Sequence, residues 1–337
     1  MITAMEASSI VTTKTLERLE TVSMRRFKNI LLFSNAEARE QATLERAVDL
    51  AVRNDARLTV MSVLEKVPNQ VGGVIKSMTA EKLEELMIND QKKSLGQFIA
   101  PYRKKGIGIE IKVVSGVPFY ELIRDVVDHG RDLVMKTASG SGGLRESLFG
   151  STALHLMRKC PTPVWVMKSS TTPTYRRLMA AVDPAPDDPV KAELARTILQ
   201  LASSLARQDG SELHIVHTWK MEGEAVLRGG RVSIQPSEID KAALEIELAH
   251  RKWLDQLVAE VDLEGVRHDT HLLNGAPDRL LPSMAADLKT ELIVMGTVGR
   301  TGLAGFFIGN NAEKVLHEVD TSVLTVKPRG FLTPVTF

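Results

Sequence analysis

The chain repeats its own turn residues at a fixed distance. Gly116-Val117-Pro118 and Gly275-Ala276-Pro277 each follow an apolar run and open a helical pattern, and they lie 159 positions apart. Gly150 and Gly309 are separated by the same 159 positions. Two spans that share such landmarks indicate a tandem duplication. The length of 337 residues agrees with this, because one domain usually takes about 150 residues.

Apolar runs alternate with amphipathic helical patterns in both halves of the chain. Runs such as Leu292-Ile293-Val294-Met295 are apolar on both faces, as strands covered by helices on both sides must be. We therefore predict an α/β protein with two tandem doubly wound domains, each with a five-stranded parallel sheet. The expected strands are 30–33, 58–64, 108–114, 132–135 and 163–167 in the first half, and 178–182, 213–217, 267–273, 292–295 and 323–326 in the second.

The domain limits follow from these patterns. We expect a disordered leader over residues 1–25, a first domain over 26–168, a polar linker over 169–175, a second domain over 176–328 and a C-terminal tail over 329–337. The leader has no apolar run that could act as a signal sequence, and Met24 is an alternative start. No later stretch reaches the roughly 18 apolar residues of a membrane helix. We expect a cytoplasmic protein without membrane insertion.

The composition argues against several functions. Lys plus Arg (43) and Asp plus Glu (42) nearly cancel, so no strong field attracts nucleic acid. The single cysteine, Cys160, permits neither an intramolecular disulfide nor a cysteine-based zinc site. His214 and His217 are three apart on a predicted strand and should point to opposite faces, and His268 and His271 share this spacing. We therefore expect no native metal site.

Ligands of doubly wound domains bind at the carboxyl ends of the strands, near the point where the strand order reverses. In the second half, strand four runs into 296–302, and nine residues separate Gly299 from Gly309-Asn310-Asn311, which opens a helix. Glycines let the chain approach a ligand, and the start of a helix attracts anions. Arg300 adds a guanidinium that can bind phosphate. The alternative is a glycine-rich turn followed by an Asn N-cap.

This pattern resembles the nucleotide-binding signature of ATP-binding members of the universal stress protein (UspA) superfamily, in which the second glycine precedes nine residues and a Gly-Ser or Gly-Thr pair. The resemblance covers about residues 26–337 and implies a flavodoxin-like, Rossmann-like fold of the adenine nucleotide alpha hydrolase type. It also implies an internal pseudo-dimer, with the fifth strands near the shared surface. The residues implied to bind the nucleotide are Asp183, Val216, Gly296, Gly299, Arg300, Gly309, Asn310 and Asn311.

Asp183 is implied to hold the nucleoside, since its carboxylate can accept hydrogen bonds from ribose hydroxyls. Its alternative role is a turn or a helix cap within residues 183–187. Val216 would line the adenine pocket. Asn310 replaces the Ser or Thr of the signature, which removes a hydroxyl contact.

The first half keeps only part of the signature. Gly140 and Gly150-Ser151-Thr152 are retained as weaker candidate ligands of a phosphate. Lys136 stands where Gly296 stands in the second half, and Asn35 takes the place of Asp183. We predict that the first site is closed or has altered specificity.

Residues 134–136, 155–161, 296–302 and 333–335 match a tandem-domain subgroup of the family more closely. The resemblance implies a stress-response factor without catalysis. The residues themselves agree, since no general acid and base pair can be placed in the sequence. Its second domain would bind ATP or another adenine nucleotide, with Mg²⁺, or another small anionic ligand, and would signal to an unknown protein partner. A further homodimer is compatible with this reading. The alternatives are a non-nucleotide scaffold, a protein that binds a lipid or another small ligand, and a slow ATPase.

Overall fold

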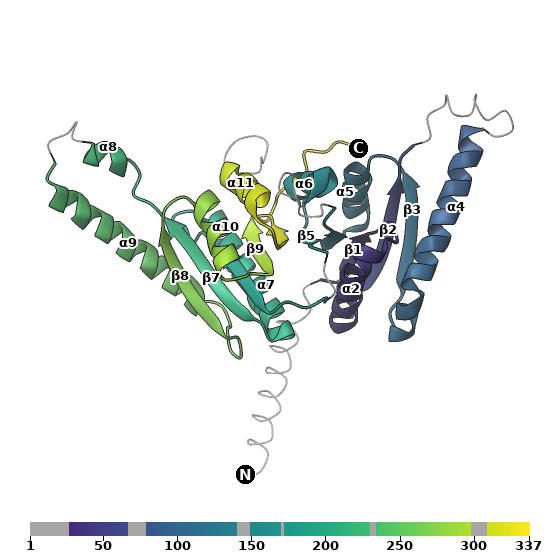
Figure 1. Cartoon of the computed structure of the whole chain (residues 1–337), viewed down its shortest axis with the longest axis horizontal. Coiled ribbons are helices and arrows are strands. Elements are labelled where there is room, and N and C mark those ends of the chain that lie inside the picture. Colours follow the sequence, from purple (N-terminus) through teal and green to yellow (C-terminus); the bar gives the residue numbers. More distant parts are fainter. Residues whose placement is uncertain (1–26, 67–78, 140–148, 170–171, 230–233, 298–308) are drawn as a thin grey trace, which may run out of the picture. The chain divides into compact units, whose positions relative to one another are not determined.

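The structure is a computed structural model that describes residues 27–66, 79–139, 149–169, 172–229, 234–297 and 309–337. Packing divides the chain into two compact units, and the division falls between Lys136 and Thr137. Strands and helices alternate along both units (Figure 1), which confirms the predicted α/β class. The predicted leader over residues 1–25 lies outside the described residues.

Unit 1 contains a parallel sheet in the order β3-β2-β1-β4. The central strand is β1, whose Ile30 lies opposite Leu58 on one side and Leu133 on the other. The strands are β1 (Asn29–Phe33), β2 (Arg57–Leu64), β3 (Ile109–Ser115) and β4 (Leu133–Thr137). The helices are η1 (Ala38–Glu40), α2 (Gln41–Asn54), α4 (Ala80–Ile99), η2 (Ala100–Lys105) and α5 (Pro118–His129).

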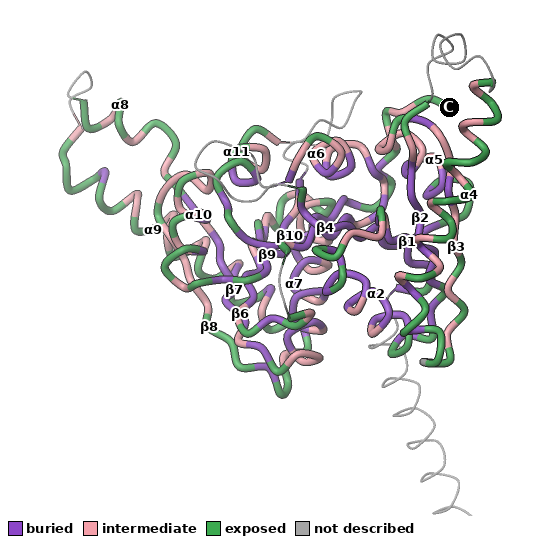
Figure 2. The backbone as a smooth tube through the Cα atoms, turned by 45° about the vertical axis from the view of Figure 1, so that its right-hand side comes forward, coloured by how far each residue is buried: buried purple, intermediate pink, exposed green. Residues whose placement is uncertain are grey.

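The apolar patterns of unit 1 become its core. The first predicted strand is almost fully buried from Ile30 to Leu32, and α2 buries the apolar side chains that its helical period places on one face. Helix α4 differs, because only Leu95 and Ile99 near its end are buried. In Figure 2 the strands β1, β2 and β4 are mostly purple, whereas β3 and α4 are largely green and pink.

Unit 2 contains a six-stranded sheet in the order β5-β10-β9-β6-β7-β8. Its strands pair in parallel except β5 and β10, which are antiparallel. The strands are β5 (Val164–Met167), β6 (Arg177–Ala181), β7 (Glu212–Trp219), β8 (His268–Asn274), β9 (Leu292–Gly296) and β10 (Ser322–Val326). The helices are α6 (Gly150–Lys159), α7 (Pro189–Asp209), α8 (Glu224–Arg228), α9 (Pro236–Ala259), α10 (Pro277–Asp287) and α11 (Asn310–Glu318).

The two predicted fifth strands pair with each other. Leu324 on β10 lies opposite Trp165 on β5, and all residues of both strands are buried. Because backbone hydrogen bonds join β5 to β10, the segment from Thr137 to β5 packs with the second half of the chain. The units of packing therefore separate before the predicted linker over 169–175. The domain limits given above concern the sequence repeat and stay a prediction.

The repeat of sequence is also a repeat of structure. The order β3-β2-β1-β4 in unit 1 recurs as β8-β7-β6-β9 in unit 2. The N–H of Gly116 donates to Leu64 at 2.9 Å, and the N–H of Gly275 donates to Trp219 at 2.8 Å, so both end the third strand of their half in the same way. A Cβ at Gly116 would lie 2.6 Å from Oε1 of Glu121. Glycine therefore lets α5 begin directly after the strand.

Candidate functional site

Two neighbouring strands of unit 2 end together at the predicted site. Strand β6 lies between β9 and β7, and Ala181 on β6 is opposite Met295 on β9. The residues that follow these strands, Asp183 and Thr297, therefore leave the sheet side by side. This is the edge at which parallel α/β sheets bind ligands.

The carboxylate of Asp183 is open to solvent. Its side chain is 66% exposed, and its ion-pair partner is Lys191, with Nζ 3.7 Å from Oδ2. The cap of α7 comes from Asp188, whose Oδ1 accepts hydrogen bonds from the N–H groups of Val190 and Lys191 at 3.1 and 3.2 Å. The alternative that Asp183 caps this helix is therefore wrong. Its backbone carbonyl joins the turn by accepting from the N–H of Ala185 at 2.9 Å.

The start of α11 is held at the end of β9. The N–H of Gly309 donates to the carbonyl of Thr297 at 2.8 Å. Gly309 has the extended backbone of an N-cap, with φ −65° and ψ 139°. Asn310 and Asn311 are the first two helical residues, and both are exposed. The alternative of an Asn N-cap is therefore wrong, because the capping position falls one residue earlier. The first N–H groups of a helix have no acceptor within it, so this end attracts anions.

Gly296 is needed for packing. A Cβ at this position would lie 3.0 Å from Cδ2 of Leu194 and 3.5 Å from Cδ1 of Ile198, both on α7. The absence of a side chain at Gly296 therefore lets α7 pack closely against β9. The sequence pattern had predicted that this glycine makes room for a ligand. The other two predicted members of this loop, Gly299 and Arg300, lie outside the described residues.

Lys327, directly after β10, was not among the predicted site residues. Its Nζ donates hydrogen bonds to Oγ1 of Thr297 and, at 2.7 Å, to the carbonyl of Met157. Burial lowers the pKa of Lys327 to about 7, although the nearby Cys160 thiol acts in the opposite direction. Thr297 is thus fixed through its carbonyl by Gly309 and through its hydroxyl by Lys327. In the sequence, the feature that could have identified Lys327 is a lysine placed directly after an apolar strand.

A cluster of four rings lies beside Asp183. His217 on β7 stacks on His250 of α9 with centroids 5.0 Å apart, and Trp219 stacks on His250 at 6.1 Å. Trp253 meets His250 edge-on at 4.7 Å. The sequence predicts a strand at His217, but no local pattern links this residue to His250 and Trp253, which lie on α9.

The hydrogen bonds of the ring cluster fix its tautomers. Nδ1 of His217 lies 3.1 Å from the carbonyl of Val182, so this nitrogen carries the hydrogen. Nε2 of His217 then accepts from Nδ1 of His250 at 2.8 Å, which leaves Nε2 of His250 as an acceptor. Burial lowers the pKa of both histidines, although the charge of Asp183 opposes both shifts. The two rings are therefore mainly neutral at pH 7.

Val216 is a buried member of the strand ladder. It is 1% exposed, and its carbonyl accepts the N–H of Val182 at 2.9 Å. Its side chain points to the face opposite His217, since neighbouring strand residues alternate. Its contact with an adenine base stays a prediction.

Unit 1 fills the corresponding strand exit with its own side chains. Asn35, which replaces the aspartate, accepts a hydrogen bond from Oγ of Ser62 at 2.9 Å. Oε2 of Glu40 accepts from Oγ of Ser34 at 2.6 Å and from the N–H of Asn35 at 2.9 Å. Lys136 is buried, which lowers its pKa to about 8, while the Glu40 carboxylate opposes this shift. Ser34, Glu40 and Lys136 are thus buried within unit 1, whereas Asn35 is exposed.

The candidate phosphate ligands predicted in the first half of the sequence lie on α6, which packs in unit 2. Gly150, Ser151 and Thr152 form its first turn. Gly150 has φ +66°, and a Cβ there would lie 3.1 Å from Cβ of Ser139, so glycine is favoured on both grounds. Gly140 lies outside the described residues.

The remaining histidines and the cysteine offer no metal site in the part of the chain that the structure describes. His214 lies on the face of β7 opposite His217, as predicted, and its Nδ1 is 3.2 Å from Nε2 of His271. Cys160 is buried, which raises the pKa of its thiol to about 12. Among the described residues, no three His, Cys, Asp or Glu side chains gather in a metal-binding arrangement. None of the described helices has the length and apolarity needed to cross a membrane.

Comparison with known proteins gives matches along nearly the whole chain. The model of the universal stress protein family matches residues 26–168 and again 174–327. Universal stress protein E of Escherichia coli (strain K12) is 27% identical over 314 residues, which cover 93% of this chain and 98% of that protein. The universal stress protein E homolog of Haemophilus influenzae is 25% identical over 313 residues, covering 90% and 98%.

Solved structures agree on the fold. A crystal structure of a functionally unknown protein from Pseudomonas aeruginosa PAO1 has a TM-score of 0.66 and 22% identity, covering 90% of this chain and 94% of that one. Two consecutive family matches and the repeated strand order confirm two tandem doubly wound domains. The chain therefore belongs to the universal stress protein family, as a tandem member similar to universal stress protein E.

Proposed function

We propose that this chain is a non-catalytic cytoplasmic stress-response protein that binds an adenine nucleotide in its second domain and signals its occupancy through protein contacts. The observation that carries the proposal is the exposed carboxylate of Asp183 at the strand exit that also holds the start of α11. A carboxylate can accept hydrogen bonds from both ribose hydroxyls, and a helix start attracts phosphate. The resemblance of the Gly299 and Gly309 spacing to the family signature supports the same ligand.

The ring cluster supports a planar base as part of that ligand. Aromatic faces stack on nucleobases, and His250 and Trp253 are partly exposed. Nε2 of His250 is an acceptor, which suits the exocyclic amine of adenine. Mg²⁺ would accompany the phosphates, since this ion usually keeps waters and few protein ligands in such sites.

We further propose one nucleotide for each chain. Glu40 and the buried Lys136 support a closed first site, because Ser34 and Asn35 donate hydrogen bonds to the Glu40 carboxylate and its charge acts on Lys136 within unit 1. The first domain would then be structural. The antiparallel pairing of β5 with β10 supports an internal pseudo-dimer.

Calorimetric titration of the full-length protein with ATP and Mg²⁺ tests the proposal. We compare wild type with Asp183→Asn, and with Asp187→Asn as a control on the same exposed loop. Hydrogen bonds to a charged group are worth about 1.5–3 kcal/mol, so Asp183→Asn should weaken binding about tenfold or more. Asp187→Asn should bind as wild type does. A Gly296→Lys variant would be a poor test, because its side chain would strike α7.

Several outcomes would contradict parts of this proposal. If wild type gives no heat and native mass spectrometry finds no copurified nucleotide, the chain is a scaffold or binds another ligand. Two bound nucleotides per chain would refute the closed first site. Release of inorganic phosphate that depends on Asp183 would make the protein a slow ATPase.

A further inference from the structure

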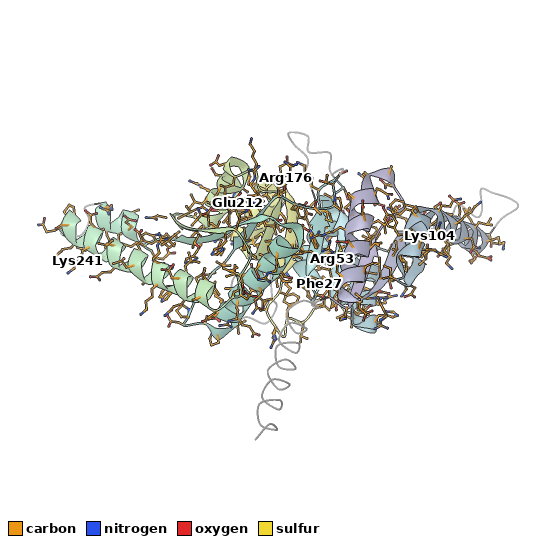
Figure 3. The ribbon with its side chains drawn as sticks, turned by 90° about the horizontal axis from the view of Figure 1, so that it is seen from below. Phe27, Arg53, Lys104, Arg176, Glu212 and Lys241 are labelled. Atoms are coloured by element: carbon orange, nitrogen blue, oxygen red, sulfur yellow. The ribbon has the colours of Figure 1, made fainter. Side chains whose placement is uncertain are left out.

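Helix α9 extends well beyond the sheet that it packs against. Its last turns are anchored by the buried Leu254 and Leu257, and Glu260, just after the helix, pairs with Arg196 on α7 at 2.6 Å. Its first turns leave the sheet together with α8 (Figure 1). Lys241 lies on this extended part, well away from Glu212 at the start of β7 (Figure 3).

One side of α9 forms a continuous exposed stripe, which we call the outer stripe. Leu244 and Leu248 lie one turn apart on it and are 54% and 59% exposed. Residues spaced by three or four positions share one helix face. By this spacing the outer stripe consists of Lys241, Leu244, Glu245, Leu248, Arg251, Lys252 and Asp255, all of which are exposed.

The charges of the outer stripe complement a second copy of themselves in one arrangement. When two copies run antiparallel and cross at Leu248, Lys241 of one copy lies opposite Asp255 of the other, and Glu245 lies opposite Arg251. A parallel pair would place Lys241 against Lys241. An antiparallel pair shifted by one turn would place Lys241 against Arg251, or Glu245 against Asp255. The centred antiparallel register is twofold symmetric, brings the two copies of Leu248 together and places opposite charges on both sides of them.

We propose that α9 forms a homodimer interface, in which the outer stripes of two chains pack antiparallel about a twofold axis. Such an interface is isologous, so each charge pair occurs twice. Among described residues, neither Lys241 nor Asp255 has an ion-pair partner within its own chain. A single helix pair buries less than the roughly 1,200 Å² of a standard interface, so the dimer is weak and concentration-dependent.

Sedimentation velocity of the full-length protein, from micromolar to hundreds of micromolar concentrations, tests the interface. Wild type should shift from monomer to dimer. Leu248→Glu should raise the dimer Kd at least about tenfold, because two carboxylates would then meet at the crossing point. The matched control is Leu86→Glu on α4, where the leucine is 45% exposed, and it should dimerise as wild type does. A wild type that stays monomeric, or a Leu248→Glu variant that dimerises normally, would overturn the proposal.

Charge exchange tests the register separately. Lys241→Asp alone places Asp against Asp255, and Asp255→Lys alone places Lys against Lys241, so each variant by itself should dimerise about tenfold more weakly. Mixing the two variants restores both opposite-charge pairs, and the mixture should form heterodimers with nearly wild-type affinity. A mixture no better associated than its components would refute the antiparallel register. Loss of folding cannot mimic the expected rescue.

Discussion

Replacing Lys327 by methionine should remove much of the pH dependence of the stability of unit 2. In the folded protein burial lowers the pKa of this amine to about 7, from an ordinary value of 10.5. Between these values the unfolded chain holds a proton that the folded chain has released. The free energy of unfolding therefore rises with pH across this window.

The size of the effect follows from the shift. One pH unit corresponds to about 1.36 kcal/mol, and the amine is about half titrated at pH 7, so Lys327 should add about 2 kcal/mol between pH 7 and pH 9. Its side chain is only 8% exposed, so solvent screens little of this energy. Below about pH 6 the lysine is protonated in both states and adds no further slope.

Urea unfolding at pH 7 and pH 9, followed by tryptophan fluorescence, measures this difference. All three tryptophans, Trp165, Trp219 and Trp253, lie in unit 2, so the signal reports the unit that contains Lys327. Lys327→Met also loses hydrogen bonds, but it loses them at both pH values. The control is Lys168→Met, which removes an exposed lysine paired with Asp320.

Wild type and Lys168→Met should gain about 2 kcal/mol more than Lys327→Met between the two pH values. Equal gains in wild type and Lys327→Met would refute the reasoning, because Lys327 would then have the same pKa in both states.

Two other tests address buried groups. Burial raises the pKa of the Cys160 thiol to about 12, so a disulfide reagent should label it only after urea unfolding, and rapid labelling of the native protein would contradict this. Arg131→Ala should destabilise unit 1 by about 3 kcal/mol, because the buried Asp125 loses a partner at 2.8 Å and keeps Lys112 at 2.6 Å. Urea unfolding followed by far-UV circular dichroism measures the change, and a loss below about 1 kcal/mol would show that Lys112 alone compensates the carboxylate.

Local patterns were sufficient for most of the secondary structure. The run from Leu292 to Met295 had to be a buried strand, because a sequence apolar on both faces needs cover on both sides, and it forms most of β9. The short α8 (Glu224–Arg228) and the two 3₁₀ segments were not predicted, because none is long enough to show a hydrophobic period.

For the candidate site, too, the sequence predicted one part and the structure decided another. Because it follows a recognisable strand, Asp183 could be placed at a strand exit from the sequence alone. The sequence left open whether its carboxylate caps a helix, and this was decided by Asp188, whose side chain takes that role.

The sequence by itself determined the α/β class, the duplication and the succession of strands and helices along the chain, since these depend on periodicity and on turn residues a few positions apart. Tertiary structure alone decided that His217 meets His250, that Lys327 reaches Thr297 and that β5 pairs with β10. The period of a strand or helix fixes which face a side chain occupies. The side chains that it contacts on other elements depend on how distant parts of the chain pack together, and no local pattern encodes that packing.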